Sequence, residues 1–214
     1  MNEQMMPGAN SLQRAYRRTL LSRWLCLGVL TALVLASFIS DLATGPAGLG
    51  WWDVARGLLQ PGRLDAAQTV IILELRVPYA LMALVVGASL GLAGAEMQTA
   101  LNNPLASPFT LGVGAAATLG AALVILLRPN LGGLGADLLL PLAAFACAFL
   151  SCLLLLLVAR LLGEALHTLV LFGIALLFGL NALVGLLQFL ADADALQQIV
   201  FWTLGSLARA DLQR

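Results

Sequence analysis

Few side chains in this sequence of 214 residues are of a type that performs covalent chemistry. The chain has one histidine, His167, and three cysteines, Cys26, Cys147 and Cys152, which lie inside apolar runs without a CxxC spacing. A metal site needs several such ligands at short spacing, and a nucleophile needs a base beside it. The sequence offers neither arrangement. We therefore expect no catalytic residue and no metal site, and we interpret the cysteines as small apolar side chains.

The more informative polar residues lie within long apolar runs. Glu96 is one of them, and a carboxylate at the centre of a membrane helix costs about 2.5–3.5 kcal/mol on insertion scales. Such a group needs a partner, water or a proton. Gln98, Asn102 and Asn103 are near enough in sequence to satisfy it. We expect a buried polar network at Glu96, with proton coupling as the alternative.

Two further patterns have the spacing of a helix. Asn181 and Gln188 lie about two turns apart on one face, which also carries Gly185. Such a stripe either lines a pathway or hydrogen-bonds a neighbouring helix, and the spacing favours neither. Gly87 and Gly91 form a GxxxG step, which lets helix backbones approach closely in lipid. We expect these two glycines to serve a translocation pathway or helix packing, together with Gln98, Asn181 and Gln188.

The elements that carry these residues have the composition of a membrane protein. The chain is 61% hydrophobic and only 10% charged, whereas a soluble domain has roughly 25% charged residues. Its formal net charge is zero, so nothing indicates nucleic-acid binding. The composition predicts an all-α fold, a polytopic bundle of transmembrane helices.

Arginine placement and apolar runs divide the chain. Arg14, Arg17, Arg18 and Arg23 precede the first apolar run, which predicts a cytoplasmic N-terminal tail over 1–23. A transmembrane domain over 24–214 should follow, with spans long enough to cross an apolar core of roughly 30 Å. About five spans are expected, over approximately 24–41, 77–98, 109–128, 138–160 and 168–190.

Two short amphipathic segments are expected outside these spans. Residues 42–75 form an external connection, and part of 51–60 is expected to be a short interfacial helix. Trp51 and Trp52 suit that position because an indole buries its ring and keeps its N–H hydrated. A second short helix is expected at the outer surface over about 195–207.

The connection between the second and third spans is uncharged and contains Pro104 and Pro108, which disfavour a continuous helix. Ser107 is suited to cap a helix whose first residue is Pro108. Asn102 and Asn103 can close the free groups of the preceding helix end. The pattern indicates either a packed helix break or an ordinary tight turn.

Several blocks of the sequence, in order, resemble the permease signature of the FecCD-type family of iron-siderophore, haem and vitamin B12 importers of the ATP-binding-cassette (ABC) class. The blocks are Arg76-Val77-Pro78, Val86-Gly87-Ala88-Ser89-Leu90-Gly91-Leu92-Ala93-Gly94, Met97-Gln98, Asn103-Pro104-Leu105-Ala106-Ser107-Pro108, Leu111-Gly112-Val113, Gly173-Ile174-Ala175, Asn181-Ala182-Leu183 and Phe201-Trp202-Thr203-Leu204-Gly205-Ser206-Leu207.

The resemblance implies a permease subunit that moves an iron chelate, or a related chelate such as haem or cobalamin, across the inner membrane. The implied partners are a second permease subunit, cytoplasmic ATPases and an external substrate-binding protein. No cofactor would be bound directly, because the ATPases use the ATP. A proton-coupled secondary transporter and a non-transporting fragment are the alternatives.

The resemblance also bears on Arg76 and on length. Arginines of the family's RxPR motif meet acidic residues of the binding protein. Here Arg76 is the first of them, and Tyr79 occupies the position of the second. Docking by Arg76 and Tyr79 is one expectation, and an arginine that extends to lipid headgroups is the other.

The chain resembles the first part of a ten-helix permease, so a truncated form unable to drive import alone is expected.

Overall fold

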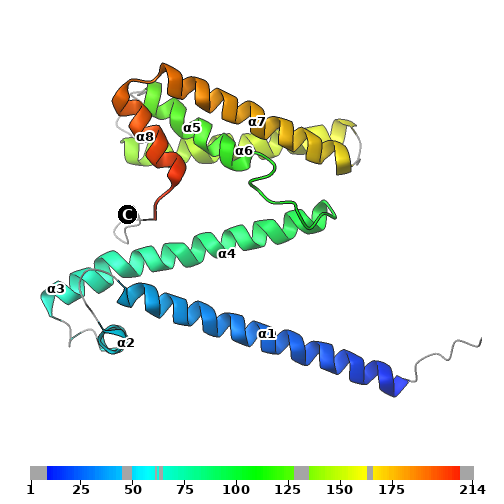
Figure 1. The fold of residues 1–214 in the computed structure, drawn as a ribbon, viewed down its shortest axis with the longest axis vertical. Helices are drawn as coiled ribbons and strands as arrows, with labels where there is room; N and C mark the ends of the chain where they lie inside the picture. The colour runs from blue at the N-terminus through cyan, green and yellow to red at the C-terminus, as the bar shows by residue number, and fades with distance from the viewer. Residues whose placement is uncertain are drawn as a thin grey trace, which may run out of the picture. The chain divides into compact units, whose positions relative to one another are not determined.

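The computed structural model describes residues 9–44, 50–60, 62, 65–127, 135–162 and 166–207. Those residues are mostly helical and contain no strand, so the predicted all-α class is confirmed. In chain order the helices are α1 (Ala9–Ala43), α2 (Trp51–Leu59), α3 (Ala66–Thr69), the π-helix η2 (Val70–Arg76), α4 (Val77–Ala100), α5 (Val113–Leu127), α6 (Ala136–Leu162), α7 (Leu166–Leu190) and α8 (Ala193–Leu204) (Figure 1). The chain divides into two compact units, and the division falls between Met82 and Ala83.

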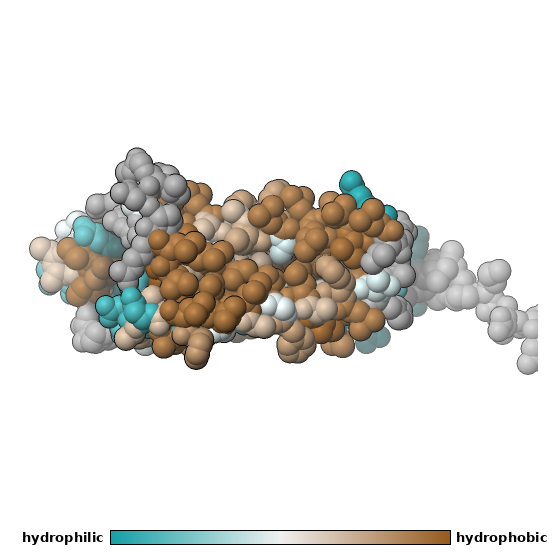
Figure 2. All heavy atoms as spheres, turned by 90° about the horizontal axis from the view of Figure 1, so that it is seen from above, coloured by the Kyte–Doolittle hydropathy of each residue, from teal (hydrophilic) through white to brown (hydrophobic). Residues whose placement is uncertain are grey.

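Lengths and apolar content identify the membrane-crossing elements. Among the described residues, four helical stretches are long and apolar enough to span, against about five expected. They cover Tyr16–Ala43, Ala66–Ala100, Leu138–Leu161 and Thr168–Leu190. Apolar side chains cover most of the face seen in Figure 2. This surface suits lipid, because helices satisfy their backbone hydrogen bonds internally and need no water beside them.

Some boundaries differ from those expected. Helix α1 begins at Ala9, inside the segment expected as a tail, because Leu, Gln and Arg in that segment are good helix formers. The expected span 109–128 is helical only over Val113–Leu127. Fifteen residues rise about 22 Å, which is less than the roughly 30 Å of an apolar core. The short helix expected over about 195–207 begins at Ala193, after the cap Asp192.

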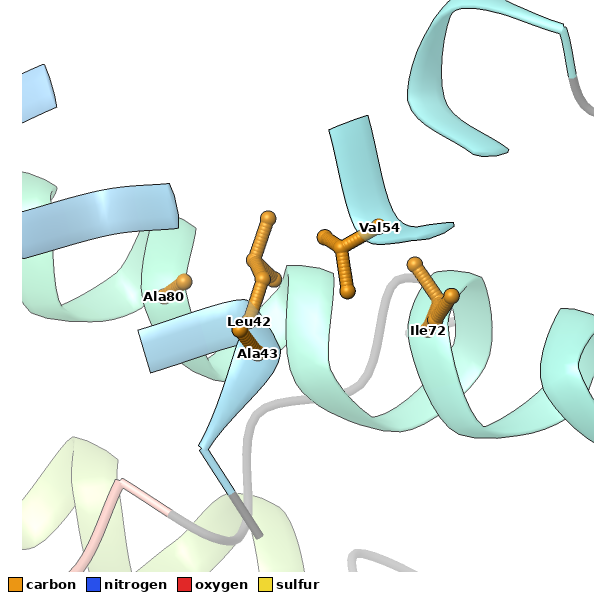
Figure 3. Close-up of a cluster of buried hydrophobic side chains, with 5 residues drawn as sticks. All are labelled: Leu42, Ala43, Val54, Ile72 and Ala80. Atoms are coloured by element: carbon orange, nitrogen blue, oxygen red, sulfur yellow. The ribbon is translucent and has the colours of Figure 1, made fainter. Parts of the chain in front are cut away.

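A small core holds the first unit together. Its buried side chains come from α1, α2, η2 and α4, and they point toward one another in Figure 3: Leu42, Ala43, Val54, Ile72 and Ala80. The remainder of α1 contributes little to this core, since its residues 21–37 are all exposed. The core therefore joins the C-terminal end of α1 to the start of the second span.

The π-helix η2 lies directly before Pro78. Proline has no N–H, so the carbonyl of Glu74 loses the donor that an α-helix would supply. In η2 the N–H of Val77 donates to the carbonyl of Ile72, five residues back. Such wide turns rotate the following residues relative to a continuous α-helix. The change of helix type thus accommodates the proline and redirects the side chains around it.

In the second unit, α5 packs against α6, α7 and α8. Its contact with α6 requires a glycine, because a Cβ at Gly120 would lie 2.8 Å from the carbonyl carbon of Ala143 and 2.9 Å from Sγ of Cys147. Its contact with α8 is an ordinary apolar one, in which Ala195 and Ile199 are buried in one cluster with α5 side chains. The short α5 is therefore the central helix of this unit.

Replacing Gly120 by alanine is expected to destabilise the protein by about 1–3 kcal/mol, because the new methyl group overlaps the α6 backbone. Gly179→Ala is the matched control, since a Cβ at Gly179 meets nothing within 4 Å. The control should be neutral or slightly stabilising, as alanine is the better helix former by about 1 kcal/mol. Thermal unfolding of purified protein in detergent compares the two, and equal effects would contradict the close α5–α6 approach.

Candidate functional site

The end of α4 is closed by a Schellman motif. The N–H of Asn103 donates to the carbonyl of Gln98 at 3.0 Å. The N–H of Asn102 donates to the carbonyl of Thr99 at 3.2 Å, and Asn102 has a positive φ of 41°. Asparagine tolerates this left-handed conformation better than most residues. The two asparagines therefore terminate the helix with their main chain.

A tight turn follows immediately. The N–H of Ala106 donates to the carbonyl of Asn103 at 3.1 Å, and the N–H of Leu105 donates to Oδ1 of Asn103 at 3.0 Å. Pro104 takes the second position of this turn, where its fixed φ is favourable. The side chain of Asn103 is thus used within its own turn.

Residues 107–112 then form a single closed turn. The N–H of Thr110 donates to Oγ of Ser107 at 3.2 Å, and the N–H of Ser107 donates to Oγ1 of Thr110 at 3.0 Å. This reciprocal pair is the arrangement of a capping box. Pro108 follows Ser107 and needs no donor there. The turn continues no further as a helix.

A second Schellman motif ends this turn. The N–H of Val113 donates to the carbonyl of Pro108 at 3.2 Å, and the N–H of Gly112 donates to that of Phe109 at 3.3 Å. Gly112 has a φ of +81°, which glycine adopts without strain. The helix α5 therefore begins at Val113, beyond the capped turn.

Apolar side chains hold this helix break against α6 and α7. Leu101, Ala106 and Leu111 are buried in one cluster with Leu155 of α6, and side chains of α7 pack against it. A Cβ at Gly112 would lie 3.0 Å from the backbone nitrogen of Leu177. Irregular backbone at membrane depth requires such cover. The connection between α4 and α5 is thus a packed helix break.

The other small and polar residues expected in a pathway lie on open faces. A Cβ at Gly87, Gly91 or Gly185 meets nothing within 4 Å, and residues 81–92 are all exposed. Asn181 is exposed, Gln188 is half-buried, and neither side chain is hydrogen-bonded to a neighbouring helix in the part of the chain that is described. The polar stripe of α7 is therefore open, while the opposite part of that helix covers the break.

The polar network expected at Glu96 is not formed among the residues with described side chains. Glu96 is exposed and makes no hydrogen bond with Gln98, Asn102 or Asn103. At the helix end, the main-chain N–H groups of Asn102 and Asn103 donate to α4 carbonyls, and the Asn103 side-chain oxygen accepts from the N–H of Leu105. These main-chain donors are therefore not available to the Glu96 carboxylate.

Arg76 has a partner that the sequence did not indicate. Its Nη1 donates to the carbonyl of Leu42 at 2.6 Å, in a partly buried contact. Leu42 lies in the last turn of α1, where carbonyls have no intrahelical donor and a cation complements the helix dipole. The neighbouring Tyr79 is half-buried. Sequence reasoning missed this bond because a backbone carbonyl has no signature in the side-chain pattern.

Comparison of the sequence with known protein families identifies the family of this chain. Residues 32–214 match the FecCD transport family. The chain belongs to this family. With its apolar helices, family membership makes it a multi-pass membrane protein.

Named relatives in the family differ in cargo. The chain is 43% identical over 141 residues to the probable iron chelatin transport system permease protein of Helicobacter pylori strain J99, covering 65% of the chain and 40% of the relative. It is 32% identical over 198 residues to the vitamin B12 import system permease protein BtuC of Vibrio cholerae, covering 92% and 55%. The chain spans about half the length of the curated relatives it matches.

A solved structure has the same fold over most of the chain. It is described as a metal-chelate type ABC transporter in an inward-facing conformation, and it matches with a TM-score of 0.70 and 29% sequence identity. The match covers 88% of this chain and 55% of the other. The chain therefore shares its fold with this transporter over most of its length.

Gly112→Ala is expected to cost about 1–3 kcal/mol, because alanine is strained at positive φ and its methyl group meets the α7 backbone. Asn102→Gly is the matched control at the other Schellman motif, where glycine fits the conformation, and its effect should stay within about 0.5 kcal/mol. Thermal unfolding in detergent measures both. A tolerated Gly112→Ala would contradict the packed break.

Arg76→Ala should loosen the end of α1, because it leaves the Leu42 carbonyl without its donor at a cost of about 1–3 kcal/mol. Hydrogen–deuterium exchange of peptides covering the last turn of α1 should become faster. Arg160→Ala, which removes an exposed arginine of α6, is the control and should leave that exchange unchanged. Unchanged exchange in Arg76→Ala would mean that the bond to Leu42 does not stabilise the end of α1.

Proposed function

We propose that the chain is part of the permease of an ABC importer that moves an iron chelate, or a related chelate such as haem or cobalamin, across the inner membrane. The observation that carries this proposal is the family match over residues 32–214. Relatives named for iron chelatin, vitamin B12 and hemin transport support the cargo class. Since those names differ, the proposal extends to metal chelates as a class.

The open face of α7 is the proposed contribution of this chain to the pathway. Asn181 and Gln188 offer amide donors and acceptors, and Gly185 between them adds no side chain to that face. A polar chelate that crosses an apolar membrane needs hydrogen-bonding groups along its route to replace water. Gly87 and Gly91 of α4 provide a second open face, suited to close approach by another helix.

The transport cycle that we propose requires partners. A second permease subunit, identical or different, completes the pathway, and cytoplasmic ATPases hydrolyse the ATP, so this chain is no enzyme itself. An external substrate-binding protein delivers the chelate. The N-terminus lies in the cytoplasm, as the arginines before the first span favour.

Docking of the binding protein at Arg76 and Tyr79 is compatible with the bond to Leu42. A guanidinium has five N–H donors, and the bond to Leu42 takes one of them. The bond fixes the arginine at the end of α1, which reduces the entropy lost when a carboxylate binds. Arg76 would then serve both the fold and docking.

Uptake of radiolabelled iron chelate, haem and cobalamin tests the function in the source organism. Inactivation of the gene should abolish vanadate-sensitive uptake of one of these cargoes. Unchanged uptake of all three would contradict the proposal and favour a non-transporting fragment. Uptake that resists vanadate but collapses with a protonophore would indicate a secondary transporter instead.

The pathway assignment has its own variants. Asn181→Leu should lower uptake about tenfold, equivalent to roughly 1.4 kcal/mol, at unchanged abundance in the membrane. Gln198→Leu, at an exposed position on α8, is the control and should transport normally. Normal uptake by Asn181→Leu would remove the α7 stripe from the pathway.

A further inference from the structure

The short helix α2 has three distinct sides. Val54 is fully buried and Leu58 is half-buried against the core of the first unit. A second side carries large apolar side chains that nothing in the described chain covers, with Trp51 59%, Trp52 70% and Leu59 83% exposed. The third side is polar. A helix that only covered the core would have no reason to keep its largest apolar side chains outside.

The position of α2 along the membrane normal follows from its packing. Val54 contacts the cluster of Leu42 and Ile72 (Figure 3). Leu42 lies in the last turn of one candidate span, Tyr16–Ala43, and Ile72 lies near the start of the next, Ala66–Ala100. Helix α2 is therefore held at the level where two spans meet the membrane boundary.

On the polar side of α2, Arg56 lies beside an indole. The guanidinium of Arg56 lies over the ring of Trp52, with 5.6 Å between its central carbon and the ring centroid. Both side chains are exposed. Indoles concentrate at the headgroup level of membranes, and arginine binds phosphate oxygens through charge-assisted hydrogen bonds. The pair matches a lipid headgroup with acyl chains below it.

We propose that α2 is an in-plane helix that binds the lipid surface. Trp51, Trp52 and Leu59 insert at the boundary between headgroups and acyl chains, and Arg56 binds a lipid phosphate. The neighbouring helix α1 has a similar apolar surface, because its residues 21–37 are exposed and mostly apolar. Lipid thus covers both surfaces. This inference does not depend on the transported cargo.

Binding at this level would set the depth of the first unit. The buried face of α2 touches the end of α1, whose carbonyl holds Arg76. An anchored α2 therefore holds the Arg76–Leu42 bond near the headgroups, within reach of an external partner. The lipid contact would position a docking residue without touching it.

Tryptophan quenching tests the proposal on the full chain in lipid nanodiscs. The chain has four tryptophans, at positions 24, 51, 52 and 202, so Trp24→Phe with Trp202→Phe leaves only those of α2. Spin labels near the headgroup should quench this variant at least about twofold more strongly than labels at the acyl-chain ends, and aqueous iodide should quench weakly. A variant that keeps only Trp202 provides the comparison.

Other outcomes identify other surroundings of α2 and would overturn the proposal. Strong quenching by iodide without quenching by lipid labels would place the indoles in water. Protection from both quenchers would mean that protein covers them. For the phosphate contact, phosphatidylglycerol is exchanged for phosphatidylcholine, whose choline cation neutralises the phosphate and competes with Arg56. This exchange should reduce headgroup quenching in the parent and have no effect in Arg56→Gln. An equal response in both would remove Arg56 from lipid binding.

Discussion

The need to satisfy backbone hydrogen bonds without water governs this structure. A bilayer offers no donors or acceptors to a helix end, so each end at membrane depth must be closed by the protein itself. The helix break between α4 and α5 meets this need twice, at Asn102 and at Gly112. Arg76 closes the end of α1, and Asp192 accepts a bond from Ala195 at the start of α8.

Glycine has two separate uses in the chain. At Gly112, Gly120 and Gly173, a Cβ would meet the backbone or side chains of a neighbouring segment, so these positions fix how the second unit packs. At Gly87, Gly91 and Gly185, a Cβ would meet nothing within 4 Å. The first group allows close packing between segments of the chain, and the second leaves surfaces for lipid, cargo or another protein.

Much of the fold was predictable because apolar length and proline position are local signals. The spans over 138–160 and 168–190 lie within α6 and α7, and Ser107 and Pro108 start a capped turn. That turn ends early at the Schellman glycine Gly112, whose close contact with α7 no local pattern encodes. For the same reason the bond from Arg76 to a distant carbonyl, and the exposure of Glu96, could not be predicted.

The doubly closed turn between α4 and α5 has a mechanical consequence. Prolines in a membrane helix often serve as hinges, since they remove a hydrogen bond and leave the backbone free to bend. Here the bonds around Pro104 and Pro108 are replaced, and Leu101, Ala106 and Leu111 are buried against neighbouring helices. The connection is thus a stiff corner. Any rearrangement of these helices must move the C-terminal end of α4, α5 and α7 together as one body, and the bending must occur elsewhere.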